Sequence, residues 1–333
     1  MYQLLSKGKT VYCVVRARND FEAYGRVVDK LKEIKDPSQD LPLNQLIVYC
    51  GDLQQENLGL APEVYQQLAA DISEIYNSTG NINFMASLKD SLDVNLLGLN
   101  HVMKFAQMGH LKKVNHISTL SVLGHDHYVI EDLELAPISY VKSKVLAEQY
   151  LRGYRDKRNG VSIQRLGRIA GNDRNYAVPD NDLFWRLLVS IHQLGCCPQE
   201  FLEFETDLTP VNVVVEALLK NADSRNDNHI INYFSESLVT FGRCVELLEE
   251  VSSKKIEMVP YEQWMDAAEN DQEWNQIKVL IPLFRENVFY EPEENSVVTE
   301  NSPDKNYQSR ITIKNSISDE VIKCFLKNVL SRY

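Results

Sequence analysis

The sequence Lys113-Val114-Asn115-His116-Ile117-Ser118-Thr119 is followed about twenty residues later by Tyr140-Val141-Lys142-Ser143-Lys144. The first stretch is typical of a buried strand that ends in two hydroxyl side chains. The second is typical of a helix, on which positions i and i+4 share one face. We therefore expect the phenol of Tyr140 and the ammonium of Lys144 to point the same way, with the hydroxyl of Thr119 delivered beside them at the strand end.

These three side chains suit the protonation of a carbonyl oxygen as hydride reaches its carbon. A phenol has a pKa near ~10, which a neighbouring cation lowers, and we expect Lys144 to act on Tyr140 in this way. The hydroxyl of Thr119 would hold the substrate oxygen where negative charge develops. Ser118 and Ser121 compete with Thr119 for this role, and a Tyr-x-x-x-Lys match is common by chance, so the surrounding sequence decides.

Strand-like apolar runs alternate with helical stretches along the chain, as a parallel sheet requires. We expect a helix over 89–107, where apolar residues recur at helical spacing, and another that ends at Asn221, with Thr209 as its N-cap and Pro210 in its first turn. The expected strands lie at 10–16, 45–50, 72–76, 113–118, 162–169 and 230–234. This order predicts an α/β fold with a Rossmann-like, doubly wound parallel sheet and a smaller C-terminal lobe.

Residues 114–124, 140–144 and 164–171 resemble the extended short-chain dehydrogenase/reductases. Within that superfamily the chain is most similar to the thioester reductase domains, which end nonribosomal peptide and polyketide assembly lines, carboxylic acid reductases and aminoadipate reductases. Further resemblances follow in the family's order at 10–18, 51–53, 75–77, 93–98 and 208–212.

The resemblance implies an enzyme that uses NADPH to reduce an acyl thioester to an aldehyde or alcohol. The thioester would be carried by coenzyme A or by a phosphopantetheine-bearing carrier protein. It also implies a division into an NADP-binding domain, residues 1–170 and 207–236, and a substrate-binding lobe, residues 171–206 and 237–333. Another extended short-chain reductase or epimerase, acting on a nucleotide sugar or a fatty acyl substrate, is the alternative enzyme. Residues 260–264, which resemble the C-terminal lobe of thioester reductases, favour the first interpretation.

The resemblance assigns Thr119, Tyr140 and Lys144 as the catalytic residues. Residues 122–124 resemble the superfamily's Val-Tyr-Gly, and counting back from them selects Thr119 over Ser118. Arg16 and Arg18 follow the second strand of the family's sheet, where arginines suit the 2′-phosphate of NADP through fork-shaped hydrogen bonds. The other cofactor-binding residues implied, besides Tyr140 and Lys144, are Asp52 and Leu53 at the adenine, Asn77 where a histidine is usual, and Asn95, which braces the lysine region.

The strand and the Gly-x-x-Gly-x-x-Gly turn that open the family's fold are not found in this sequence. Residues 1–8 are typical of the end of a first helix that runs directly into the strand at 10–16. Glycines of that turn let a pyrophosphate approach backbone N–H groups at a helix N-terminus. We expect the natural protein to begin before Met1 and the 333-residue chain to bind NADPH weakly. A truncated, inactive remnant or a scaffold is the alternative from a different functional class.

Composition is that of an ordinary globular protein, with 44% apolar and 25% charged residues. The net charge of −12 argues against a nucleic-acid partner, and no apolar run approaches the ~20 residues that span a membrane. None of the six cysteines forms a Cys-x-x-Cys pair, which indicates thiols in a reducing cytoplasm.

His125 and His127 are too few ligands for a metal site. The polar, acidic segment 291–306 is expected to be a loop.

Overall fold

The computed structural model describes residues 1–34, 40–124, 129–154, 160–222, 229–271, 276–285, 308–314 and 317–333. His125, His127 and the acidic segment 291–306 lie outside these ranges. The chain divides into two compact units, and their assignment to cofactor and substrate stays a prediction. The first unit comprises Met1–Leu166, Val215–Tyr233 and Ser296–Ile311, and the second comprises Gly167–Val214, Phe234–Asn295 and Thr312–Tyr333.

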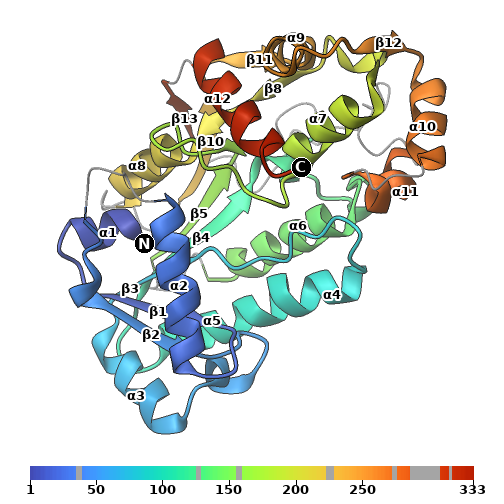
Figure 1. Cartoon of the computed structure of the whole chain (residues 1–333). Helices are drawn as coiled ribbons and strands as arrows, with labels where there is room; N and C mark the ends of the chain where they lie inside the picture. The colour runs from blue at the N-terminus through green and yellow to red at the C-terminus, as the bar shows by residue number, and fades with distance from the viewer. Residues whose placement is uncertain are drawn as a thin grey trace. The chain divides into compact units, whose positions relative to one another are not determined.

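Two sheets contain the six predicted strands, and the α/β class with a parallel sheet is confirmed (Figure 1). Strands β1 (Val11–Val15) and β2 (Leu46–Cys50) form a parallel pair. The larger sheet has the order β13-β10-β5-β4-β3, and its β10–β5, β5–β4 and β4–β3 pairs are parallel. Its strands are β3 (Glu74–Asn77), β4 (Lys113–Thr119), β5 (Val161–Leu166), β10 (Ile230–Ser235) and β13 (Gln308–Ile313).

Among the described residues, no strand pairing joins the β1–β2 pair to the larger sheet, in which β3 is an edge strand. Tyr12 and Val14 of β1 and Ile75 of β3 nevertheless pack on one hydrophobic cluster. That cluster is completed by helices α3 (Pro62–Asp71) and α5 (Gly98–Gln107). Shared packing on these helices, rather than a hydrogen-bonded ladder, therefore holds the two sheets together within the first unit.

Helices cover the strands through apolar faces at helical spacing. Helix α2 (Asp20–Ile34) packs Ala23, Val27 and Leu31 on β1 and β2. Helices α5 and α6 (Ser139–Arg152) cover β4 and β5 in a second cluster. Its fully buried members include Leu99 and Met103 of α5, Ala147 and Leu151 of α6, and Val114 of β4. Each large apolar side chain buried in this way contributes about 1.5–3 kcal/mol to folding, so α6 is held firmly against the end of β4.

The helix expected over 89–107 is interrupted by a π-helical turn. Helix α4 (Leu88–Leu92) is capped by Ser87, whose hydroxyl accepts from the Asp90 N–H at 3.1 Å. Residues Asp93–Leu97 then form the π turn that leads into α5. Such turns insert one extra residue and are frequent at functional sites, and Asn95 lies inside this one.

Two of the expected boundaries are wrong. The strand expected over 162–169 ends at Leu166, and Ile169–Ala170 form a separate strand, β6, paired with β9 (Thr209–Pro210). Thr209 is therefore extended and donates its N–H to the Arg168 carbonyl at 3.3 Å, instead of capping a helix. Helix α8 (Val211–Ala222) begins directly after this short ladder, because a tertiary backbone contact outweighed the local capping signal.

The second unit is built on helices around an aromatic core. Helix α7 (Leu183–Leu194) is capped by Asp182 and ends at Gly195, which has a φ of 74° that favours glycine. Trp185 of α7 packs edge-on against Phe325 of α12 (Asp319–Leu330), with ring centroids 5.6 Å apart. The unit's other longer elements are α9 (Phe241–Ser252), α10 (Tyr261–Asn270), α11 (Ile281–Arg285), β7 (Cys196–Pro198), β8 (Glu205–Asp207), β11 (Leu238–Thr240) and β12 (Glu257–Val259).

Candidate active site

Thr119, Tyr140 and Lys144 meet where β4 ends and α6 begins. The Thr119 hydroxyl donates to Ser121 Oγ at 3.1 Å and lies close enough to the phenol of Tyr140 to lower its pKa. One turn further along α6, Lys144 is only 5% exposed and donates from Nζ to the Ile117 carbonyl at 2.9 Å. The predicted strand–helix arrangement thus brings a hydroxyl, a phenol and an ammonium to one place, as the sequence pattern requires.

The pKa of Tyr140 shifts in the direction opposite to the predicted one. Burial raises the pKa of the phenol, and the interaction with Thr119 only partly opposes this rise. The ammonium of Lys144 is directed at the Ile117 carbonyl. Burial lowers the pKa of Lys144 to about 8, against the raising effect of the Glu148 carboxylate. Near neutral pH, Tyr140 is therefore a protonated donor beside a lysine that is close to losing its charge.

Ser118 and Thr119 differ in where their hydroxyls point. Ser118 is 5% exposed and donates to the Glu148 carboxylate at 2.5 Å, on the side of the sheet that α6 covers. Thr119 instead contacts Tyr140 and accepts from the Ser121 N–H at 3.1 Å. Because successive strand residues face opposite sides, only Thr119 of these two is available to a reacting carbonyl, which supports its assignment over Ser118.

Asn95 reaches α6 through Ser143. Its Nδ2 donates to Ser143 Oγ at 2.7 Å, and Ser143 in turn donates to the Tyr140 carbonyl at 2.7 Å. The Asn95 Oδ1 accepts from the Asn81 N–H at 2.7 Å, which ties the loop after β3 to the same point. A Cβ on Gly80 of that loop would lie 3.6 Å from Lys144 Nζ. Ser143 and Asn81 were not predicted from the sequence, although Ser143 lies within the Tyr140–Lys144 motif.

Asn77 lies at the end of β3 and contacts His116, whose pKa is affected by Lys144. It is 6% exposed, and its Nδ2 donates to Nδ1 of His116 at 3.2 Å. Burial lowers the pKa of His116 well below its ordinary value, and the charge of Lys144 acts in the same direction. His116 is therefore neutral, and Asn77 contacts the site through an uncharged partner.

Arg16, Arg18, Asp52 and Leu53 form a separate group at the ends of β1 and β2. Arg18 has a side chain that is 87% exposed and pairs with Glu22, at 2.7 Å between Nε and Oε2. The Asp52 carboxylate accepts from the backbone N–H two residues further on, at 2.9 Å, and the Leu53 carbonyl accepts from His101 Nδ1 of α5 at 2.7 Å. These contacts hold the group to its near neighbours and to α5 rather than to Tyr140.

The hydrogen-bond donors described above fit a nicotinamide dinucleotide at its nicotinamide ribose and at a phosphate. The Tyr140 hydroxyl and the Lys144 ammonium suit a nicotinamide ribose, and the exposed guanidinium groups of Arg16 and Arg18 suit a phosphate. For the pyrophosphate between them, the sequence offers no glycine-rich turn after a strand. Across the described ranges, no group of three His, Cys, Asp or Glu side chains could hold a metal ion. Each helix described is also too short or too polar to span a bilayer.

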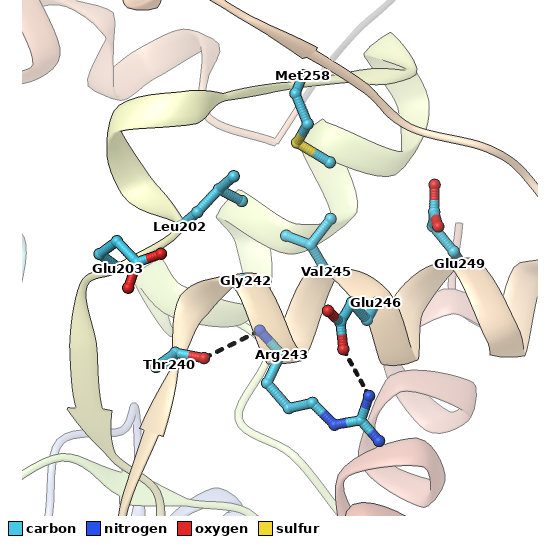
Figure 2. A pocket seen from close by; sticks show the side chains of 9 residues that line it. All are labelled: Leu202, Glu203, Thr240, Gly242, Arg243, Val245, Glu246, Glu249 and Met258. Carbon is cyan, nitrogen blue, oxygen red and sulfur yellow. Dashed lines mark hydrogen bonds and ion pairs between the residues drawn. The ribbon is translucent and has the colours of Figure 1, made fainter.

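A cavity of about 340 Å³ lies in the second unit, and its lining residues fall between Leu202 and Met258 (Figure 2). Its apolar wall includes Leu202, Val245 and Met258, and its rim carries Arg243 paired with Glu246 at 2.6 Å. None of the predicted site residues lines it, so the cavity does not bear on the assignment of the catalytic group.

The parallel α/β sheet and the Thr119–Tyr140–Lys144 arrangement define an extended short-chain dehydrogenase/reductase. The model of an NAD-binding family, described as male sterility protein, matches residues 1–218, and the chain belongs to this family. The terminal R domain from the myxalamid polyketide–nonribosomal peptide pathway has the same fold. Its TM-score is 0.83 at 22% identity, over 99% of this chain and 86% of that one.

Curated relatives are larger proteins. A linear gramicidin synthase of Brevibacillus parabrevis is 25% identical over 277 residues, which are 78% of this chain and 5% of that protein. The aldehyde reductase lnbA of Aspergillus flavus is 26% identical over 275 residues, which are 76% of this chain and 27% of that protein. The chain therefore spans less than a third of the length of either relative.

Proposed function

We propose that the protein is an NADPH-dependent reductase that converts an acyl thioester, carried by a phosphopantetheine-bearing carrier protein or by coenzyme A, to an aldehyde or alcohol. The observation that carries the proposal is that the Thr119 hydroxyl and the Tyr140 phenol interact beside the buried Lys144 at the end of β4. The relatives support it, because they include a gramicidin synthase and an aldehyde reductase.

Each catalytic side chain has a role in this proposal. A bound NADPH would supply the hydride. Thr119 and Tyr140 hold the thioester oxygen, and the raised pKa of Tyr140 keeps its proton available for donation at neutral pH. Lys144 stabilises negative charge that develops nearby, and it does so while it is protonated, below its pKa of about 8.

The remaining predicted residues are proposed to bind the cofactor. Arg16 and Arg18 would bind the 2′-phosphate, Asp52 and Leu53 the adenine, and Asn77 and Asn95 the nicotinamide end. In this proposal, residues 1–170 and 207–236 form the NADP-binding domain, and 171–206 and 237–333 the substrate lobe. A cytoplasmic location is supported by the cysteines, because all six are free thiols.

A direct assay tests the proposal. The purified protein is mixed with an acyl-pantetheine thioester and a high concentration of NADPH, because weak binding is expected. NADPH loss is followed by absorbance, and the aldehyde is trapped with a hydrazine. We expect NADPH consumption that matches aldehyde or alcohol formed, with NADH a poorer substitute. A folded protein that neither binds nor consumes NADPH would contradict the proposal and favour the inactive scaffold.

A further inference from the structure

A buried ion pair lies beneath the candidate active site. Arg165 on β5 and Glu148 on α6 have side chains that are 0% and 1% exposed, and their Nη2 and Oε2 atoms are 2.6 Å apart. Arg165 Nε lies 3.1 Å from each of the two carboxylate oxygens, and its Nη1 donates to Asn232 at 3.3 Å. Neither Arg165 nor Glu148 belongs to the residues that the sequence predicts for the site.

The pair is connected to all three catalytic residues by the geometry of α6 and β4. Glu148 lies four residues after Lys144, as Lys144 lies four after Tyr140, so the three share one helix face. The carboxylate of Glu148 also accepts from Ser118 at 2.5 Å. Ser118 stands between Ile117, whose carbonyl accepts from Lys144, and Thr119, which contacts Tyr140. Glu148 therefore joins the end of β4 to α6 at the site itself.

Stability alone is a poor reason for such a pair. Two charges lose much hydration on burial, and well-packed apolar residues in their place are often equally stabilising. What an apolar pair could not supply is a hydrogen bond to Ser118 and a negative charge one helical turn from Lys144. These two contributions both act on the residues proposed to carry out the reaction.

We propose that Glu148 is a positioning residue which, backed by Arg165, holds the end of β4 against α6 and places a negative charge one helical turn from the Lys144 ammonium. The kinetic consequence of this inference rests on the proposed function, whereas its effect on the ionisation of Lys144 does not.

The groups around Lys144 show why the charge of Glu148 matters. Tyr140 and Glu148 face it from α6, His116 from β4, and Arg165 lies behind Glu148 on β5. Burial lowers the pKa of Lys144 to about 8, and Glu148 is the group that raises it. The pKa of His116 is lowered, so it is neutral there. If Glu148 lost its charge, the guanidinium of Arg165 would no longer be balanced and would favour the neutral amine further.

A stability titration tests the inference without any assay of activity. The folded pKa of Lys144 is below its ordinary value of 10.5, so between about pH 8 and 10.5 the unfolded state binds more protons. Stability should therefore rise with pH across that window. In Glu148→Gln this rise in stability should begin about one pH unit lower, because the Lys144 amine of the folded protein would bind its proton about tenfold more weakly. Denaturant unfolding is measured over the range from about pH 6 to 10 in both proteins.

The contribution of Lys144 is isolated by repeating both titrations in a Lys144→Met background, where the stability difference caused by Glu148→Gln should no longer depend on pH.

Glu131→Gln is the matched control, because Glu131 pairs with Arg152 of the same helix near the surface. This variant should leave the pH at which stability begins to rise unchanged. If Glu148→Gln does not fold, Glu148→Gln with Arg165→Met removes both charges and should still move the rise to lower pH. A rise at the wild-type position in either variant overturns the inference.

Turnover gives a second readout. If the protein reduces thioesters, the loss of turnover at alkaline pH should move to lower pH in Glu148→Gln, while Glu131→Gln keeps the wild-type profile. Absence of turnover in the wild type contradicts the proposed function but leaves the titration decisive for Glu148. Normal turnover together with an unmoved titration overturns the role of Glu148 alone.

Discussion

The β4–α6 group and the β1–β2 group, which are proposed to hold opposite ends of one cofactor, are built in different ways. At the end of β4, Lys144 is 5% exposed and Ser118 and Asn95 are as deeply buried, each with its own hydrogen-bond partner. At the end of β1, Arg18 has a side chain that is 87% exposed and pairs with Glu22 in the next helix. The reacting end is preorganised by burial, and the other end presents charge to solvent.

The difference has consequences for strength. Hydrogen bonds and ion pairs are stronger in a water-excluded interior. A buried polar or charged group that loses its partner there costs a large amount of free energy. Exposed charges are screened by salt and lose side-chain entropy when they are held in one geometry. Substitutions in the β4–α6 group should therefore have large effects on chemistry and stability, and those in the β1–β2 group small effects on binding.

Tyr140→Phe should give the largest effect on turnover. The ring and its packing remain while the proton donor is lost, so turnover should fall roughly a hundredfold or more with little change in NADPH affinity. Steady-state kinetics and a binding titration measure the two quantities. Tyr150→Phe is the control, because Tyr150 is also on α6 but its hydroxyl bonds Asn100 at 2.9 Å. Full activity in Tyr140→Phe would end the carbonyl-reductase interpretation.

Thr119→Val should come next, with a loss of turnover on the order of a hundredfold, because the hydroxyl acts on the developing oxyanion. Ser118→Ala is its natural comparison, since Ser118 donates to Glu148 rather than contacting Tyr140. We expect Ser118→Ala to keep most of the turnover and to lose some stability. The reverse result, with Thr119→Val active and Ser118→Ala inactive, would show that the hydroxyl has been assigned one residue out of place.

Glu148→Ala tests the contrast in stability. It leaves the fully buried Arg165 without its carboxylate, so the free energy of unfolding should fall by about 3–5 kcal/mol. Glu131→Ala removes a carboxylate that is 39% exposed from its pair with Arg152, and it should cost no more than about 1 kcal/mol. Denaturant unfolding at neutral pH measures both. Similar losses in the two variants would mean that burial does not separate these regions.

Arg16→Ala should have the smallest effect of the four. One lost charge-assisted hydrogen bond to the 2′-phosphate should weaken NADPH binding by about tenfold and leave NADH binding nearly unchanged. The effect should shrink as salt is raised, because the arginine is exposed. Arg18→Ala should do less, because Arg18 is already paired with Glu22. Equal losses for NADPH and NADH would mean that Arg16 is only structural.

Local patterns predicted the elements that carry the site. The apolar runs that alternate with helical stretches predicted the positions of all six strands. The spacing of Tyr140 and Lys144 predicted that both lie on one face of α6. These predictions succeeded because strand and helix periodicities are properties of neighbouring residues. The N-cap predicted at Thr209 was wrong because its competitor, the Arg168 carbonyl, comes from a segment about forty residues earlier in the chain.

What only the tertiary structure decided is the environment of those side chains. The sequence by itself determined that a hydroxyl, a phenol and an ammonium would meet at the end of a parallel strand. It did not reveal that burial raises the pKa of Tyr140, or that Arg165 reaches Glu148 beneath Lys144. Burial and ionisation depend on which distant segments pack together, and that information is absent from local spacing.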